Sequence, residues 1–175
     1  MSSRSKPDGK KLSVRQICIL ALMGALIFAT KFALAGIPNV NLNTVLIILC
    51  VVFYGWKTFY AVALYVLLEG LIFGFSIWWF SYLYAWPLVT LVAMLFRKND
   101  SPLLWAIVAG LCGLFFGPLM YILYFFINGW ETAFSMWIAG IPYDLIHCAS
   151  NFVLTLILYR PLYRVFSHFT PRESD

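Results

Sequence analysis

Long apolar stretches separated by short polar segments dominate this chain. Six of them predict membrane-spanning helices, at 14–35, 42–57, 58–76, 80–97, 102–127 and 138–160. Their lengths are near the ~20 residues with which a helix crosses about 30 Å of hydrocarbon. They also lack the alternation of membrane β-strands. We therefore expect an all-α membrane protein with six transmembrane helices in one domain.

Turn-forming residues mark several of the predicted helix ends. Gly36 and Pro38 end the first span, Lys57 separates the second from the third, and Pro142 falls in the first turn of the sixth. The first apolar stretch is longer than that of a signal peptide and lacks a clear cleavage site, so we expect a retained span. The predicted parts are an N-terminal tail at 1–13, a six-helix domain at 14–165 and a C-terminal tail at 166–175.

Composition and charge agree with this class and predict its orientation. The chain is 63% hydrophobic and 11% charged, with a mean hydropathy of +0.88. Basic residues near span ends stay in the cytoplasm, and with an internal N-terminus this places every Lys and Arg except Lys31 there. Both termini are therefore expected to be cytoplasmic. The net charge of +5 reflects orientation in the lipid bilayer and not nucleic-acid binding.

Polar side chains interrupt the apolar stretches, and all of them fall toward the outer side. Lys31, Glu69 and Asp144 belong to three different spans, and His147 and Asn151 follow Asp144 at i+3 and i+7 on one helix face. An ionisable group inside a bilayer costs roughly 2.5–3.5 kcal/mol or more. We read these five residues as the base of an outward-facing pocket. Alternatively, Lys31 pairs with Glu69 or Asp144 and is merely neutralised, and Asn151 only ties two helices together.

Loop amides and aromatic rings complete the predicted pocket. Aromatic residues make up 19% of the chain, and rings near the outer side suit a flat or ring-containing ligand. The first outer loop contributes Asn41 and Asn43, and the last outer loop, 128–137, contributes Trp130. The full set of predicted substrate-binding residues is Lys31, Asn41, Asn43, Glu69, Trp78, Trp79, Tyr82, Trp130, Asp144, His147 and Asn151.

Catalytic and metal chemistry have little support in the sequence. The two histidines, His147 and His168, lie on opposite sides of the membrane in this topology, and the four cysteines show no metal-like spacing. Neither an H-E-x-x-H motif nor a nucleophile motif is present, so we expect no enzyme, no metal site and no cofactor. The chain also has no G-x-x-x-x-G-K-[ST] loop, so ATP-driven work would require partner ATPases.

Small residues recur at helical spacing in three spans and let helices approach closely. The three sets are Ala21, Ala25, Ala29 and Ala33; Gly70 and Gly74; and Ala106, Gly110, Gly113 and Gly117. Packing within the bundle accounts for the third and fifth spans. The stripe on the first span is a candidate surface for another subunit.

The run Ala21-x-x-x-Ala25-x-x-x-Ala29 after basic residues resembles the coupling motif of S components, the substrate-binding membrane subunits of energy-coupling factor (ECF) transporters. Chain length, six spans, cytoplasmic termini and the run from Gly140 to Asn151 extend the resemblance. It implies that Ala21, Ala25 and Ala29 contact a transmembrane coupling subunit, which assembles with two ATPase subunits in a prokaryotic cell membrane. It also implies that the chain captures a micronutrient outside and reorients to release it inside.

The substrate has to be argued from the pocket itself, because S components share a fold while binding very different molecules. We expect a B-group vitamin or a similar ring compound. A closer resemblance to the cobalamin type suggests a corrinoid, which His147 would approach. The rival reading is a self-sufficient secondary carrier or small channel acting as a homo-oligomer, with Lys31, Glu69 and Asp144 as an ion relay. Against it, the sequence shows no evident inverted repeat.

Overall fold

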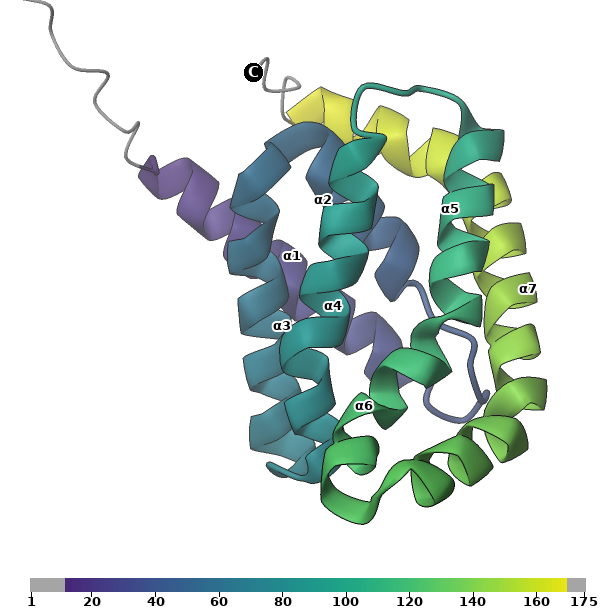
Figure 1. The fold of residues 1–175 in the computed structure, drawn as a ribbon. Helices are drawn as coiled ribbons and strands as arrows, with labels where there is room; N and C mark the ends of the chain where they lie inside the picture. The colour runs from purple at the N-terminus through teal and green to yellow at the C-terminus, as the bar shows by residue number, and fades with distance from the viewer. Residues whose placement is uncertain (1–11, 170–175) are drawn as a thin grey trace, which may run out of the picture.

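In the part of the chain that the structure describes, five helical segments are long and apolar enough to cross a membrane, which indicates a multi-pass membrane protein. The computed structural model describes residues 12–169 and is all-helical over that range (Figure 1). Most of the two predicted tails, 1–13 and 166–175, lies outside the described residues. The helices are α1 (Val14–Ala33), α2 (Asn43–Tyr54), α3 (Thr58–Phe73), α4 (Ile77–Leu95), α5 (Pro102–Leu114), α6 (Phe116–Asn128) and α7 (Trp130–Phe169).

The second and third predicted spans fall within one apolar segment, Asn43–Phe73, so the described helices give five candidate spans where the sequence suggested six. The chain reverses direction inside this segment. Gly55, with φ +53°, ends α2, and a short 3-10 turn over Gly55–Lys57 leads into α3. At 12 residues, α2 is only about 18 Å long. A separate sixth span therefore stays a prediction.

The fifth predicted helix, 102–127, is broken at Phe115 into α5 and α6. Pro118 explains the break, because it has no N–H to bond the carbonyl of Leu114 and its ring would clash with that carbonyl. The prediction of an outer loop at 128–137 is wrong. Only Gly129, with φ +83°, separates α6 from α7, and α7 begins at Trp130.

Helix α7 is 40 residues long and contains Pro142 and Pro161. Such a helix would extend about 60 Å if it were straight, but internal prolines bend helices. Figure 1 shows α7 running along one side of the bundle and turning across its top in the yellow segment. This helix contacts α5, α6 and α2, so it brings its central residues into the bundle.

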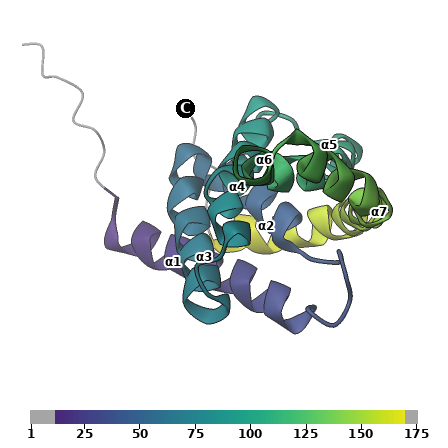
Figure 2. The ribbon, with the colours of Figure 1, turned by 60° about the horizontal axis from the view of Figure 1, so that its bottom comes forward.

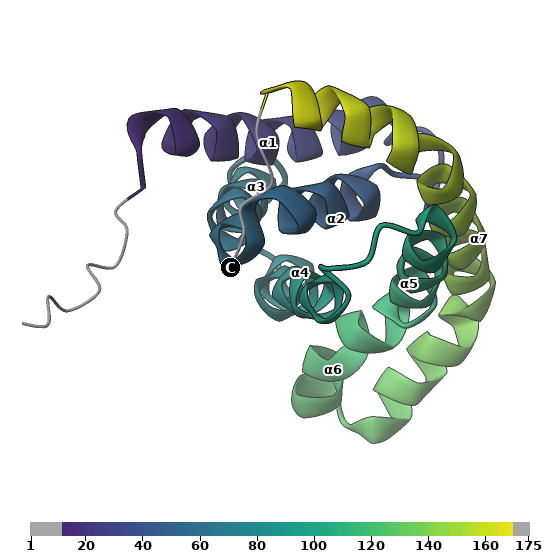
Figure 3. The ribbon, with the colours of Figure 1, turned by 90° about the horizontal axis from the view of Figure 1, so that it is seen from above.

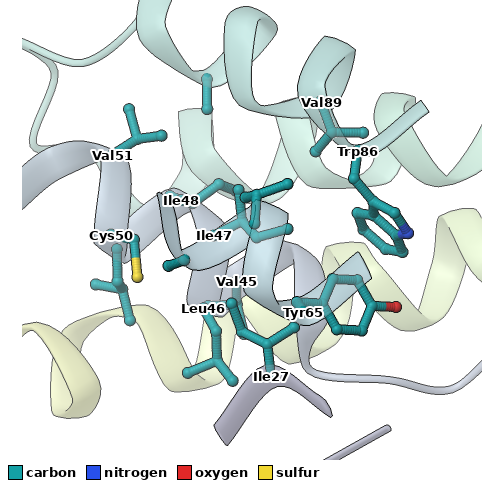
Figure 4. Packing of buried hydrophobic residues seen from close by; sticks show 14 of the residues in the cluster. Ile27, Val45, Leu46, Ile47, Ile48, Cys50, Val51, Tyr65, Trp86 and Val89 are labelled. Carbon is teal, nitrogen blue, oxygen red and sulfur yellow. The ribbon is translucent and has the colours of Figure 1, made fainter. Parts of the chain in front are cut away.

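Helix α2 forms the centre of the described bundle because it is apolar all round, the pattern of a fully buried helix. Every residue of α2 is buried, and α1, α3, α4, α5 and α7 surround it (Figure 3). Figure 4 shows the core formed by Val45, Leu46, Ile47 and Ile48 of α2 with Ile27, Tyr65, Trp86 and Val89. The neighbouring helices therefore pack against this buried centre.

The connections carrying basic residues share one end of the bundle, at the top of Figure 1. Lys57 follows α2, while Arg97 and Lys98 follow α4. The Arg97 Nε donates to the carbonyl of Val51 at 3.1 Å, which ties the connection after α4 to the last turn of α2. The sequence prediction requires these residues to share a side of the membrane. That this side is cytoplasmic stays a prediction.

The glycine stripe of α5 packs within the bundle, as the simpler reading of the sequence expected. A Cβ on Gly113 would lie 2.7 Å from the carbonyl oxygen of His147 in α7, so only glycine allows this approach. One turn earlier, a Cβ on Gly110 would lie 3.4 Å from the carbonyl oxygen of Cys148. The two helices are therefore in closest contact near Gly113.

We expect Gly113→Ala to lower the thermal unfolding midpoint of the detergent-solubilised protein. The added methyl group collides with a backbone atom that cannot rotate away, and overpacking of this kind costs about 1–3 kcal/mol. Gly110→Ala is the matched control and should leave the midpoint close to that of the parent. The midpoint is measured by tryptophan fluorescence during heating. Equal midpoints for both variants would contradict the described α5–α7 packing.

Candidate functional site

A cavity of about 610 Å³ lies at the end of the bundle opposite the basic connections. Loop 34–42 passes close to α7, as Figure 2 shows from that side. The hydroxyl of Ser150 in α7 donates to the carbonyl of Asn39 at 2.7 Å, which holds the loop there. The cavity is lined by Lys31, Leu34, Ala35, Ile37, Pro38, Asn39, Val40, Asn41, Asn43, Glu69, Phe73, Trp78, Tyr82, Trp86, Phe116, Gly117, Met120, Tyr121, Gly140, Tyr143, Asp144 and His147.

Lys31 forms an ion pair with Glu69 on one side of the cavity. Its Nζ also donates to the hydroxyl of Tyr82 at 3.1 Å and lies 4.8 Å from the centre of that ring. The indole Nε1 of Trp78 donates to the same hydroxyl at 3.1 Å. The ion pair therefore connects α1 to α3, and the tyrosine links it to α4. The sequence left open whether Lys31 pairs with Glu69 or with Asp144. In the structure its partner is Glu69.

A second polar network connects loop 34–42 to α7. The backbone N–H of Asn43 donates to Asn41 Oδ1 at 3.1 Å, which directs the amide nitrogen of Asn41 toward His147. That nitrogen lies 3.2 Å from His147 Nε2. Since an amide nitrogen only donates, Nε2 accepts and the imidazole is neutral in this arrangement. The Asn43 side chain in turn donates to the hydroxyl of Tyr65 at 2.8 Å.

Aromatic rings from three helices form a continuous wall of the cavity. The rings of Tyr82 and Trp86 in α4 are 5.9 Å apart, and Trp86 lies 4.9 Å from Phe116 in α6. Phe116 continues the contact to the imidazole of His147 in α7, at 5.3 Å and edge-on. The wall exists because the break at Phe115 turns the chain, so that Phe116 begins α6 beside the cavity. It offers ring faces to an aromatic or cationic ligand.

Asp144 lies where α7 passes the beginning of α6. The backbone N–H of Gly117 donates to its carboxylate, and the positive end of a helix dipole stabilises a negative charge there. A Cβ on Gly117 would lie 2.3 Å from both carboxylate oxygens, so glycine is needed for the contact. The Asp144 side chain is buried, with 7% of the residue exposed, and its Oδ2 has no hydrogen-bond partner among residues 12–169.

The structure brings most of the predicted binding residues together around this cavity: Lys31, Asn41, Asn43, Glu69, Trp78, Tyr82, Asp144 and His147. Three others lie away from it. The Trp79 indole donates to the carbonyl of Val66 at 2.7 Å on another face of α4, and Trp130 is 61% exposed at the start of α7. The Asn151 amide donates to Thr44 and to the carbonyl of Ala109, so it ties α7 to α2 and α5.

Sequence reasoning missed the lining residues contributed by α4 after its first turns and by α6. Trp86, Phe116, Met120 and Tyr121 have no polar pattern that separates them from core residues. Pro118 was the available signal, because a proline inside an apolar stretch predicts a helix break and a change of direction there.

The alanine stripe of α1 faces away from the rest of the chain. Ala21, Ala25 and Ala29 are exposed, while Leu20 and Ile27 point into the bundle.

Within residues 12–169, no group of three His, Cys, Asp or Glu side chains is placed to hold a metal ion. Comparisons with protein-family models, with curated proteins and with solved structures found no match to this chain.

The Lys31–Glu69 pair predicts unequal effects of removing each partner. Lys31→Met leaves a carboxylate whose side chain is only 5% exposed, whereas Glu69→Gln leaves an ammonium group on a side chain that is 29% exposed. We expect Lys31→Met to destabilise the protein more, by about 3 kcal/mol or more, because a buried charge is left uncompensated. The measurement is the unfolding midpoint in detergent.

The double variant Lys31→Met/Glu69→Gln is the control for this comparison. Because it removes both charges, it should recover most of the loss caused by Lys31→Met alone. Additive losses in the double variant would show that the two side chains are not coupled.

Proposed function

We propose that this protein captures a small ring-containing solute in the cavity between loop 34–42 and α7, as the substrate-binding subunit of an ATP-driven importer of the ECF type. The observation that carries the proposal is the cavity itself. The cavity has a volume of about 610 Å³ and is lined by an ion pair, amide groups and a wall of aromatic rings. Pockets that bind small molecules have this character, with apolar walls and a few convergent polar groups.

The position of the polar residues supports binding over a purely structural role. Lys31 and Glu69 satisfy each other, but Asp144 Oδ2 and Glu69 Oε1 are buried without hydrogen-bond partners among the described residues. Such groups are costly in an apolar environment and are usually satisfied. Both residues line the cavity, so their carboxylates lie at the place where a ligand would bind.

The size of the cavity favours a vitamin-sized ligand over a corrinoid. Drug-sized ligands occupy pockets of about 300–1,000 Å³, and a volume of 610 Å³ lies inside that range. A corrinoid is considerably larger than such a ligand. We therefore place a compact ring compound of the B-vitamin size ahead of cobalamin as the substrate.

The exposed alanine stripe supports the second half of the proposal, which concerns the partner. In a membrane, small residues on an exposed helix face allow another helix to approach closely. Ala21, Ala25 and Ala29 present such a face, and no other described helix covers it. We place the transmembrane coupling subunit of the importer there, with two ATPase subunits behind it, in the plasma membrane of a prokaryote.

Two tryptophans allow a matched test of the cavity. We expect Trp78→Leu to reduce at least tenfold the amount of small molecule that the purified protein retains from yeast extract, because Trp78 lines the cavity and bonds to Tyr82. Trp130→Leu should retain as much as the parent. The retained compounds are extracted and quantified by mass spectrometry, and equal retention by both variants would contradict the proposed location.

A bulky residue on the alanine stripe tests the partner. We expect Ala25→Trp to leave retention from yeast extract unchanged and to abolish uptake by cells, since the cavity lies away from this face. Leu26→Trp, at an exposed position beside the stripe, is the control and should keep more uptake than Ala25→Trp does. Uptake by protein-only liposomes under an ion gradient would instead support a self-sufficient carrier.

A further inference from the structure

The lining of the cavity contains more acidic than basic side chains. Lys31 is engaged by Glu69, so this pair contributes no net charge. Asp144 is the remaining carboxylate on the lining, and it forms no ion pair within the described part of the chain. Loop 34–42 adds no charged side chain to the lining, and neither do α4 and α6.

His147 does not compensate for Asp144. Its Nε2 accepts from the Asn41 amide, whose orientation is set by the backbone N–H of Asn43. The imidazole is therefore neutral. With Lys31 and Glu69 paired and His147 neutral, Asp144 is the one lining group whose charge, when it is ionised, no described residue offsets. One of its oxygens, Oδ2, is buried and accepts no hydrogen bond from residues 12–169.

We propose that the solute is an organic cation built on an aromatic ring, and that Asp144 binds its positively charged or N–H-bearing group. This inference rests on the proposed function and names the substrate class of the same cavity. A cationic ligand would offset the charge of the Asp144 carboxylate, whereas an anion would add a second uncompensated charge.

The walls of the cavity fit the same class of ligand. Tyr82, Trp86 and Phe116 present ring faces and edges within one continuous cluster. Ring faces attract cations, and this attraction is stronger where water is excluded. The Lys31 ammonium already lies over the Tyr82 ring, 4.8 Å from its centre, so Trp86 and Phe116 are the rings left for a ligand. An aromatic cation therefore finds both a stacking surface and a counter-charge.

The first measurement identifies the charge of the compound that the full-length protein retains from yeast extract. We expect a ring compound with a net positive charge at neutral pH. Retention of a neutral or anionic ring compound would overturn this inference and leave the proposed function standing. Retention of no compound at all would overturn both.

Three ring compounds that differ in charge then test the charge preference of the unsubstituted protein. 1-Methylnicotinamide, nicotinamide and nicotinate share one ring and carry positive, zero and negative charge. We expect 1-methylnicotinamide to displace the retained compound at least tenfold more effectively than the other two, measured as loss of the compound after washing. Equal displacement by all three would contradict a charge-selective site.

Asp144→Asn tests the residue directly. The variant keeps the size of the side chain and an oxygen that can accept from Gly117, so the start of α6 is preserved. We expect at least a tenfold loss of retained cation with no loss of the preference for a ring. Glu131→Gln, an exposed carboxylate on the same helix, is the matched control and should behave as the parent. If Asp144→Asn does not fold, the compound's charge and the displacement series still decide the question.

Discussion

Buried polar groups in an apolar bundle must find their partners inside the protein, because hydrocarbon offers none. This constraint organises the cavity end of the molecule. Lys31 reaches Glu69 and Tyr82 across three helices, and the Asn41 amide reaches His147 from the loop. These contacts hold α1, α3, α4, loop 34–42 and α7 around one space. Asp144 and Glu69 line this space and each keeps a buried oxygen without a hydrogen-bond partner among the described residues.

The architecture of the helices determines which residues can take part. Buried α2 occupies the centre of the bundle, and the cavity lies beyond its N-terminal end, where loop 34–42 leads into α2. The break between α5 and α6 opens the opposite wall and turns Phe116 toward His147. Close approach at Gly113 and Gly117 brings α7 near enough to place Asp144 at the start of α6. The site thus depends on glycine positions that carry no chemistry themselves.

Much of this arrangement could be predicted from the sequence, because apolar stretches report helices directly and ionisable groups within them are rarely accidental. Spacing placed Asp144 and His147 on one face of α7, and both line the cavity. The helical start at Trp130 was missed because aromatic and polar residues there resemble an interfacial loop. The positions of Trp79 and Asn151 could not be predicted, since helix rotation and neighbour contacts decide which face meets the cavity.

Native mass spectrometry of the protein after incubation with yeast extract tests the central claim, that the cavity holds a small solute, most directly. We expect one small molecule per chain, released at a collision energy that leaves the protein intact, and with a mass of vitamin size. A protein that stays free of any small-molecule adduct under gentle conditions would contradict it.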